Sequence, residues 1–278
     1  MIKGKEFAGT VSVITGASMG IGRATGRQVV SRGGSVVLIA RGRQALADAA
    51  AELTQLTTSD DQFVETIGAD TTDDRQVAAA LGGLIERRGV PDHLINCVGG
   101  ARPGYVHDLT LDDFRNQLEL NYMGQLLPTL VLIPHFVEAR RGHVSFVSSM
   151  MGYFGMIGYS AYAPSKFAVV GLAESLRHEL KPYGIGFSIL FPPDTDTPGL
   201  ANENKTKPAE TAIMSEAAGL LSPDTVARTF VDGILAGRFS IHPKGSGWIW
   251  RANRFAPGLV RMIMDRDLKK AMRKAEQR

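Results

Sequence analysis

The 278-residue chain has one cysteine, Cys97, and no long apolar run. A single cysteine excludes a disulfide bond within the chain and fits a reducing compartment, and the apolar residues around Cys97 predict a buried thiol. The longest apolar stretch, residues 126–134, is far shorter than the roughly 20 residues that a membrane-spanning helix needs. Residues 1–9 carry charges and lack the apolar segment of a secretory signal, so we expect a cytoplasmic protein.

Positive charge is scarce over most of the chain and concentrated at its end. The formal net charge is +3, yet residues 248–278 hold nine Lys or Arg against three acids, which leaves about −3 on residues 1–247. A body of this charge lacks the basic surface that nucleic-acid binding requires, so we expect no nucleic-acid partner. We assign no metal ligands.

Short apolar runs alternate with helical patterns along the chain. The runs are residues 11–15, 35–40, 62–67, 93–96, 143–148 and 185–190. The helical patterns cover residues 23–31, 44–56, 73–88, 111–138 and 162–180. This alternation predicts an α/β fold with one doubly wound, Rossmann-type parallel sheet in a single domain. We expect Pro128 and Pro134 to interrupt the helical pattern of residues 111–138.

A glycine-rich turn follows the first predicted strand and precedes a helix. Its glycines allow the backbone to approach a pyrophosphate, and the helix start offers free N–H groups to it. The expected contacts are Gly16, Ser18, Met19, Gly20 and Ile21. Because the spacing differs from the G-x-G-x-x-G fingerprint, a glycine turn without a ligand is the alternative.

The second predicted strand ends at Arg41, with Arg43 close by and no acid. An acid at this place would bind the 2′-hydroxyl of NAD, whereas arginine can hold a 2′-phosphate through two donors. NADPH is therefore the expected cofactor, and a solvated arginine is the alternative. After the third strand, Asp70 could accept a hydrogen bond from adenine or cap the next helix.

Tyr162 and Lys166 are four residues apart, so they lie on one face of a helix. A lysine cation beside a tyrosine favours the phenolate and would lower its pKa from about 10. Ser160 is expected to cap this helix. Ser149 follows the fifth strand, at the edge of the sheet where ligands sit, and Asn121 lies in a helix whose interior disfavours it. Asn121 would fill a polar slot at a distortion near the active site, or else be exposed at the surface.

These residues together resemble the short-chain dehydrogenase/reductase family. The matching motifs are Thr15-Gly16-x-x-x-Gly20-Ile21-Gly22, Asn96-x-x-Gly99, Asn121, Ser149 and Tyr162-x-x-x-Lys166. The resemblance implies that Tyr162 is the general acid, that Ser149 holds the substrate oxygen, and that Lys166 tunes Tyr162 and binds the nicotinamide ribose. Asn121 would complete a proton relay, and Asn96 would support the sheet behind the cofactor. A homo-oligomer, dimer or tetramer, is implied as well.

A closer resemblance comes from the segment after the sixth strand, which we interpret as a substrate lid over residues 192–222 because it is too long for a simple connection. Its Pro192-Pro-Asp-Thr-Asp-Thr197, Glu203-Asn204 and Lys207-Pro208 resemble the 3-ketodihydrosphingosine reductases. The resemblance implies NADPH-dependent reduction of 3-ketosphinganine to sphinganine in sphingolipid biosynthesis. Thr195 or Thr197 would meet the nicotinamide amide, Asp70 the adenine and Arg41 the phosphate.

Two departures and two alternatives accompany this assignment. The first departure is Val98, which replaces the alanine usual in the family's Asn-Ala-Gly motif. The second is that the eukaryotic reductases tend to carry membrane-spanning segments, whereas this sequence has no apolar run of that length. The fold and the catalytic set do not choose a substrate, so another hydrophobic ketone or a 3-oxoacyl thioester is the alternative. An NADP-binding sensor without turnover is a third hypothesis.

The C-terminal extension, residues 248–278, follows an NADP-binding domain of residues 1–247. Its apolar residues, among them Trp248, Phe255 and Met262, alternate with basic ones. Such a pattern is typical of a helix that lies on an anionic membrane at its cytoplasmic face. The alternative is a helix packed on the body or on another subunit.

Overall fold

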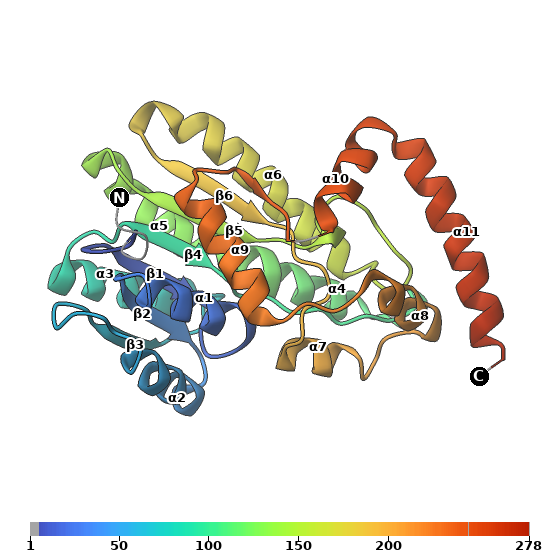
Figure 1. Ribbon diagram of the computed structural model, residues 1–278, viewed down its shortest axis with the longest axis horizontal. Helices are drawn as coiled ribbons and strands as arrows, with labels where there is room; N and C mark the ends of the chain where they lie inside the picture. The colour runs from blue at the N-terminus through green and yellow to red at the C-terminus, as the bar shows by residue number, and fades with distance from the viewer. Residues whose placement is uncertain (1–5, 244, 278) are drawn as a thin grey trace.

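The computed structural model of the chain describes residues 6–243 and 245–277 (Figure 1). Residues 1–5, part of the segment predicted to contain no secretory signal, and Arg278 of the predicted extension lie outside the described residues. Strands β1 to β7 form one sheet in the order β3-β2-β1-β4-β5-β6-β7, and every pair is parallel. Their bounds are β1 Val11–Thr15, β2 Ser35–Ala40, β3 Val64–Gly68, β4 His93–Asn96, β5 His143–Val147, β6 Gly186–Leu190 and β7 Ser240–Ile241.

The strand order reverses between β1 and β4, which confirms the predicted doubly wound sheet. Successive crossovers run outward from β1 on each side, so the carboxyl ends of β1 and β4 leave a crevice between them. Strand β2 is buried along its whole length, as a strand covered on both faces must be. Its continuous apolar sequence follows from that burial.

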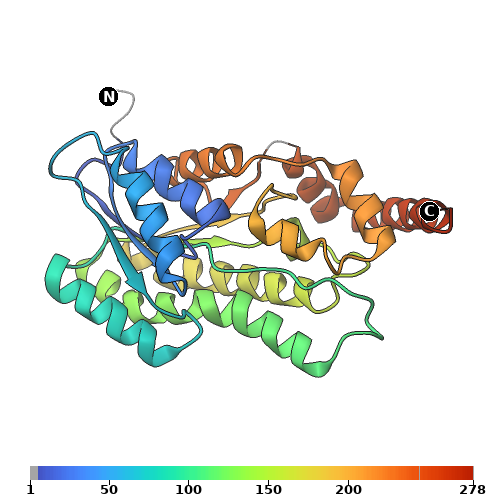
Figure 2. The same ribbon diagram turned by 90° about the horizontal axis from the view of Figure 1, so that it is seen from below.

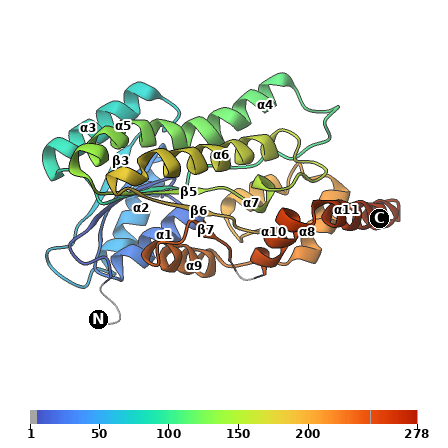
Figure 3. The same ribbon diagram turned by 90° about the horizontal axis from the view of Figure 1, so that it is seen from above.

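Helices cover both faces of the sheet (Figure 3). One layer contains α1 (Gly20–Val30), α2 (Arg43–Thr54) and α9 (Pro223–Leu235). The other contains α3 (Asp74–Arg88), α4 (Leu111–Leu118), α5 (Gly124–Ala139) and α6 (Tyr162–Leu180). A hydrophobic core lies on each face of the sheet, and successive strand residues point alternately into one core and the other. Ile14 and Leu38 pack toward α1, whereas Val13 and Val37 pack toward α5.

All six predicted strands are present, and β7 is one that the sequence pattern missed. It pairs with β6 through only Ser240 and Ile241. Two residues are too few to show an alternating or continuous apolar pattern, so sequence periodicity gave no signal for this strand.

The helical pattern of residues 111–138 is interrupted, but the predicted positions of the interruption are wrong. Pro128 and Pro134 both lie inside α5, whose buried side chains Leu132 and Phe136 anchor it in the core. That packing outweighs the backbone hydrogen bonds that the prolines remove. The break falls instead at the π-helical turn Glu119–Met123, which contains Asn121. The predicted distortion at Asn121 is thus confirmed.

The predicted cap of α6 is wrong, and so is the alternative that Asp70 caps the next helix. Ala161 takes the N-cap position of α6, because the chain enters the helix through a turn in which the Ala163 N–H donates to the Tyr159 carbonyl. The Ser160 hydroxyl is buried without a partner in the part of the chain that the structure describes. Helix α3 is capped by Asp73, which accepts hydrogen bonds from the next turn, and not by Asp70.

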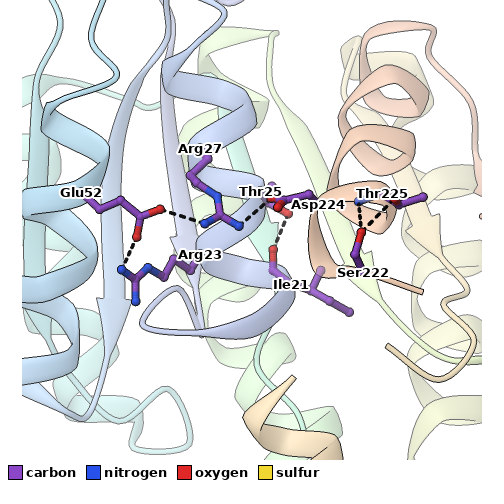
Figure 4. Close-up of polar contacts among 8 residues, drawn as sticks. All are labelled: Ile21, Arg23, Thr25, Arg27, Glu52, Ser222, Asp224 and Thr225. Atoms are coloured by element: carbon purple, nitrogen blue, oxygen red, sulfur yellow. Dashed lines mark hydrogen bonds and ion pairs between the residues drawn. The ribbon is translucent and has the colours of Figure 1, made fainter. Parts of the chain in front are cut away.

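Helix α1, which begins in the glycine turn, is held between two neighbouring helices (Figure 4). Arg27 donates to Glu52 of α2 at 2.8 Å and to Asp224 of α9 at 2.5 Å, and Arg23 also pairs with Glu52. Each of these half-exposed pairs adds at most about 1 kcal/mol. Together these ion pairs fix the orientation of α1 relative to α2 and α9.

The rest of the chain forms the lid and two C-terminal helices at one end of the molecule (Figures 1 and 2). The lid holds α7 (Pro198–Glu203) and α8 (Ala209–Ala218), and the end of the chain holds α10 (Ser246–Phe255) and α11 (Pro257–Ala275). Two short 3-10 turns belong to the body of the protein: Met150–Gly152 follows β5 and Lys181–Tyr183 follows α6. Helix α11 packs along α8. Among the described helices, none combines the length and apolar content needed to span a bilayer.

Helix α10 starts two residues before the predicted extension and packs on the body. The Asn253 side chain donates to the Tyr153 carbonyl at 2.6 Å, and the rings of Trp250 and His242 lie 5.2 Å apart. Several apolar residues of both helices nevertheless remain exposed, among them Trp248, Phe255, Leu259 and Met262.

Candidate active site

A cavity of about 570 Å³ lies at the carboxyl ends of the strands. Its walls come from the glycine turn, the ends of β2, β4 and β5, the first turn of α6, and residues of the lid. All the predicted site residues line it except Asn96 and Asn121. The sheet therefore gathers into one cavity side chains that are far apart in the sequence.

The glycine turn is shaped by positions that have no room for a side chain. Gly16 has φ +66°, and a Cβ on it would stand 2.8 Å from the backbone nitrogen of Val98. A Cβ on Gly22 would stand 2.4 Å from the Gly16 carbonyl oxygen. The backbone of this turn is thus packed directly against the end of β4 and lines the cavity with its own polar groups.

Arg41 and Asp70 stand at the ends of the adjacent strands β2 and β3. Their side chains pair at 3.6 Å, and the Arg41 side chain remains 71% exposed. Asp70 also accepts hydrogen bonds from the backbone and the hydroxyl of Thr72. Both residues line the same end of the cavity as the glycine turn, so a guanidinium is available where the adenosine half of a dinucleotide would lie.

The side chains of Ser149 and Tyr162 both line the cavity, and the Ser149 hydroxyl is near enough to that of Tyr162 to lower its pKa. Ser149 comes two residues after β5, and its Oγ also accepts from the Met151 N–H at 3.1 Å. Tyr162 is the first residue of α6, whose early turns pack against this segment. Two hydroxyls are thereby brought to one point from which both can reach a carbonyl oxygen.

The pKa of Tyr162 is raised, so the prediction that Lys166 lowers it is wrong. Burial has the largest effect, and the negative charges of Glu203 and Asp194 add to it, whereas the hydrogen bond from Ser149 opposes it. The sequence argument considered one neighbouring cation and could not see two carboxylates of the lid. Tyr162 accordingly keeps its proton at neutral pH.

Lys166 is buried behind Tyr162, with 2% of its surface exposed. Its ammonium donates to the Val147 carbonyl at 3.0 Å and lies 5.7 Å from the centre of the Tyr162 ring. Burial lowers the pKa of Lys166 to about 7. A Cβ on Gly99 would stand 2.8 Å from Nζ, which explains why a glycine faces this lysine.

Asn121 and Asn96 stand behind the cavity wall and tie its backbone together. The Asn121 side chain accepts from the Gly100 N–H and donates to the Gly100 carbonyl, both at 3.0 Å. Asn96 donates to Thr129 of α5 at 3.1 Å and accepts from Thr15 of β1 at 3.3 Å. Both contacts hold the segment after β4 in place.

Gln125 and Thr129 extend this network and were not among the predicted residues. Gln125 donates to the carbonyls of Asn121 at 2.9 Å and of Val147 at 3.1 Å, so it joins the π-helical turn to the end of β5. Polar residues at positions 121, 125 and 129 lie on one face of a helix that is otherwise apolar. That spacing was the signal by which the sequence could have revealed them.

The lid residues Thr195 and Thr197 line the cavity. Thr195 donates to the Pro193 carbonyl at 2.9 Å, and Thr197 caps α7 by accepting from the Leu200 N–H at 3.1 Å. A Cβ on Gly20 would stand 3.1 Å from Cγ2 of Thr197. The start of the lid therefore lies directly over the glycine turn.

Cys97 lies half-buried in the cavity wall. Burial raises the pKa of its thiol to about 12, which agrees with the buried thiol that the sequence predicts and makes the thiol unreactive. Within residues 6–243 and 245–277, no group of three or more His, Cys, Asp or Glu side chains is placed to hold a metal ion.

The chain is similar to proteins of known family over most of its length. Residues 10–208 match the family model for short chain dehydrogenases. A 3-dehydrosphinganine reductase of Danio rerio is 40% identical over 84% of this chain and 71% of its own length. A 3-ketodihydrosphingosine reductase of Bos taurus is 38% identical over 91% of this chain and 76% of its own.

A solved short chain dehydrogenase/reductase from Burkholderia phymatum, in complex with NAD, is 26% identical. It superposes with a TM-score of 0.79 and covers 91% of this chain and 96% of its own. Fold, site geometry and sequence therefore agree, and the chain belongs to the short-chain dehydrogenase/reductase family.

Proposed function

We propose that the protein is an NADPH-dependent ketoreductase that converts 3-ketosphinganine to sphinganine. The observation that carries the reaction type is the meeting of the Ser149 and Tyr162 hydroxyls in a cavity shared with the glycine turn. The substrate is supported by the relatives, whose names state that they reduce this ketone.

The cavity fits a nicotinamide dinucleotide. The glycine turn presents backbone that a side chain would otherwise cover, and Arg41 stands at the end of β2, where a 2′-phosphate would lie. Lys166 would donate to the ribose near the nicotinamide, while Thr195 or Thr197 would meet its amide. When bound, the reduced nicotinamide supplies a hydride for the carbonyl carbon.

Tyr162 and Ser149 would act on the oxygen of the ketone. As the carbonyl carbon gains a hydride, its oxygen becomes an alkoxide, a much stronger base than a phenolate. Tyr162 holds its proton because burial raises its pKa, and it can release that proton to the alkoxide. Ser149 donates a hydrogen bond to the same oxygen and stabilises the developing charge.

The walls beyond the two hydroxyls suit a long alkyl chain. They are formed by apolar side chains of the 3-10 turn Met150–Gly152, the loop before α6 and the lid, namely Met150, Met151, Phe154, Met156, Leu200 and Met214. Methionine side chains adapt to flexible apolar ligands. This lining favours a lipid-like ketone over a short polar one.

The test of this function is NADPH oxidation with 3-ketosphinganine, compared with an acetoacetyl thioester. We expect a much higher kcat/KM for 3-ketosphinganine. A preference for the thioester would support the alternative substrate class, and NADPH binding without oxidation of any ketone would support the sensor hypothesis.

Arg41→Ala is expected to raise the KM for NADPH about ten- to a hundredfold and to leave the KM for NADH nearly unchanged, because only NADPH carries the 2′-phosphate. Arg43→Ala is the matched control, since Arg43 is exposed two residues away but does not line the cavity. Equal changes for the two cofactors would show that Arg41 is not a phosphate clamp. Steady-state kinetics with each cofactor measures the difference.

The C-terminal helices support a peripheral contact with anionic lipid at the cytoplasmic face of a membrane. Phe255→Glu, at a side chain that is 84% exposed, is expected to lower partition onto anionic vesicles about ten- to a hundredfold, because insertion of one aromatic side chain is lost. Leu56→Glu is the control, because Leu56 is 37% exposed just after α2, at the end of the molecule opposite to α10 and α11 (Figure 1).

Co-sedimentation with vesicles measures this partition, and light scattering measures the mass of the same variants. Unchanged co-sedimentation would refute the membrane contact. A lower mass for Phe255→Glu alone would instead assign the helices to a subunit interface. We place the expected homo-oligomer contact on α4, α5 and α6, where Leu118, Leu130 and Phe167 are exposed.

A further inference from the structure

A cluster of three charged residues in the lid lies next to Tyr162. Lys207 pairs with Asp194 at 3.5 Å and with Glu203 at 3.2 Å, and only 3% of the Lys207 side chain is exposed. Tyr159 donates its hydroxyl to Glu203 as well. The cluster joins the start of the lid to the end of α7 and to the segment before α6.

The cluster carries a formal charge of −1, because two carboxylates share one ammonium. Both carboxylates line the cavity, whereas Lys207 does not. The described contacts of Lys207 and Tyr159 involve Oε1 of Glu203 and Oδ2 of Asp194, so each carboxylate keeps a second oxygen that can accept a hydrogen bond from a group in the cavity. The lid thus presents net negative charge to whatever binds there.

This charge lies close to the reacting oxygen. The Tyr159 ring, which bonds to Glu203, is 5.6 Å from the Tyr162 ring. The two carboxylates also act on the Tyr162 hydroxyl, where they raise its pKa. Negative charge beside Tyr162 opposes loss of the phenolic proton, because it repels the phenolate that would form. A cationic group on the ligand would reduce this repulsion.

We infer that Glu203, assisted by Asp194, binds the ammonium group that the substrate carries on the carbon next to its ketone. The inference rests on the proposed function, since 3-ketosphinganine is a 2-amino-1-hydroxy-3-ketone. With its carbonyl oxygen at Ser149 and Tyr162, the adjacent ammonium lies within the reach of a neighbouring carboxylate. The site would therefore select α-amino ketones over neutral ketones of equal chain length.

Lys207 has a definite part in this arrangement. Two neighbouring carboxylates without a cation between them would repel each other. The buried ammonium pairs with both carboxylates and leaves a single net negative charge for the ligand. Binding of the substrate ammonium then completes a neutral cluster.

The test compares 3-ketosphinganine with 1-hydroxyoctadecan-3-one, which lacks only the amine, at a pH at which the amine is protonated. The wild-type enzyme is expected to prefer the amino ketone in kcat/KM by about ten- to a hundredfold, the range of a hydrogen bond to a charged group. Glu203→Gln should lower kcat/KM for the amino ketone by a similar factor and leave the value for the neutral ketone nearly unchanged.

Glu210→Gln is the matched control. Glu210 belongs to the lid helix α8 and accepts a hydrogen bond from Tyr105 at 2.6 Å, but it does not line the cavity. It should change the kcat/KM of neither ketone. Asp194→Asn provides a second variant of the cluster, and the comparison of two ketones with the wild-type enzyme needs no variant at all.

The outcomes separate this inference from the proposed function. Equal kcat/KM for the two ketones with the wild-type enzyme would overturn the inference and keep the ketoreductase. Equal losses on both ketones in Glu203→Gln and Asp194→Asn would also overturn it, because the carboxylates would then only support the lid. Reduction of neither ketone by the wild-type enzyme would overturn the proposed function and this inference with it.

Discussion

Replacing Tyr162 with phenylalanine is expected to lower kcat for ketone reduction by about 10²- to 10⁴-fold while the affinity for NADPH stays nearly the same. The change removes one hydroxyl, and with it the proton that the alkoxide would receive. The ring keeps its packing against Tyr159 and its distance from the Lys166 ammonium, so the cofactor end of the cavity is preserved. Single-turnover NADPH oxidation and fluorescence titration with NADPH measure the two quantities.

Tyr105→Phe is the control for this prediction. Tyr105 donates its hydroxyl to the carboxylate of Glu210, and it lies outside the cavity lining. It should retain the wild-type rate. Near-wild-type activity of the Tyr162 variant would transfer the proton-donor role to another group, and Ser149, whose hydroxyl lies near that of Tyr162, would be examined first.

The sheet was predictable because its strands are local patterns. Apolar runs such as β2 mark strands buried on both faces, and the glycine turn after β1 marks the place where the chain turns into α1. The predicted strand starts and ends differ from the structure by no more than two residues. Strand β7 was missed because its two residues are positioned by β6 and not by a pattern of their own.

The electrostatics of the site could not be predicted in the same way. The Tyr162–Lys166 spacing correctly places both side chains on one face of α6, yet the sign of the Tyr162 pKa shift depends on burial and on Glu203 and Asp194. Those carboxylates come from a lid whose path is set by tertiary packing. Lys207 likewise looks like a surface lysine in the sequence, and only the fold shows that it is buried between two acids.

Gly16→Ala is expected to have the second largest effect, on stability and on cofactor binding together. The positive φ of Gly16 costs an alanine about 1–2 kcal/mol. Its Cβ would also stand within 2.9 Å of backbone atoms of Cys97 and Val98, and such overpacking typically costs about 1–3 kcal/mol. Relief requires movement of the turn, and a displacement of that kind can lower kcat/KM by about 100-fold.

Two other glycines separate the causes of this effect. Gly9 has φ +75°, and a Cβ there would meet no atom within 4 Å in the described structure, so Gly9→Ala isolates the backbone strain. Gly82 lies inside α3, equally open over the described residues, and Gly82→Ala should stabilise the fold by about 0.5–1 kcal/mol. Urea unfolding and NADPH titration of the three variants then give a direct comparison. If Gly16→Ala loses no more stability than Gly9→Ala and binds NADPH normally, close packing of the turn against β4 does not shape the cofactor site. A loss of NADPH affinity that occurs only in Gly16→Ala shows that this packing does shape the site.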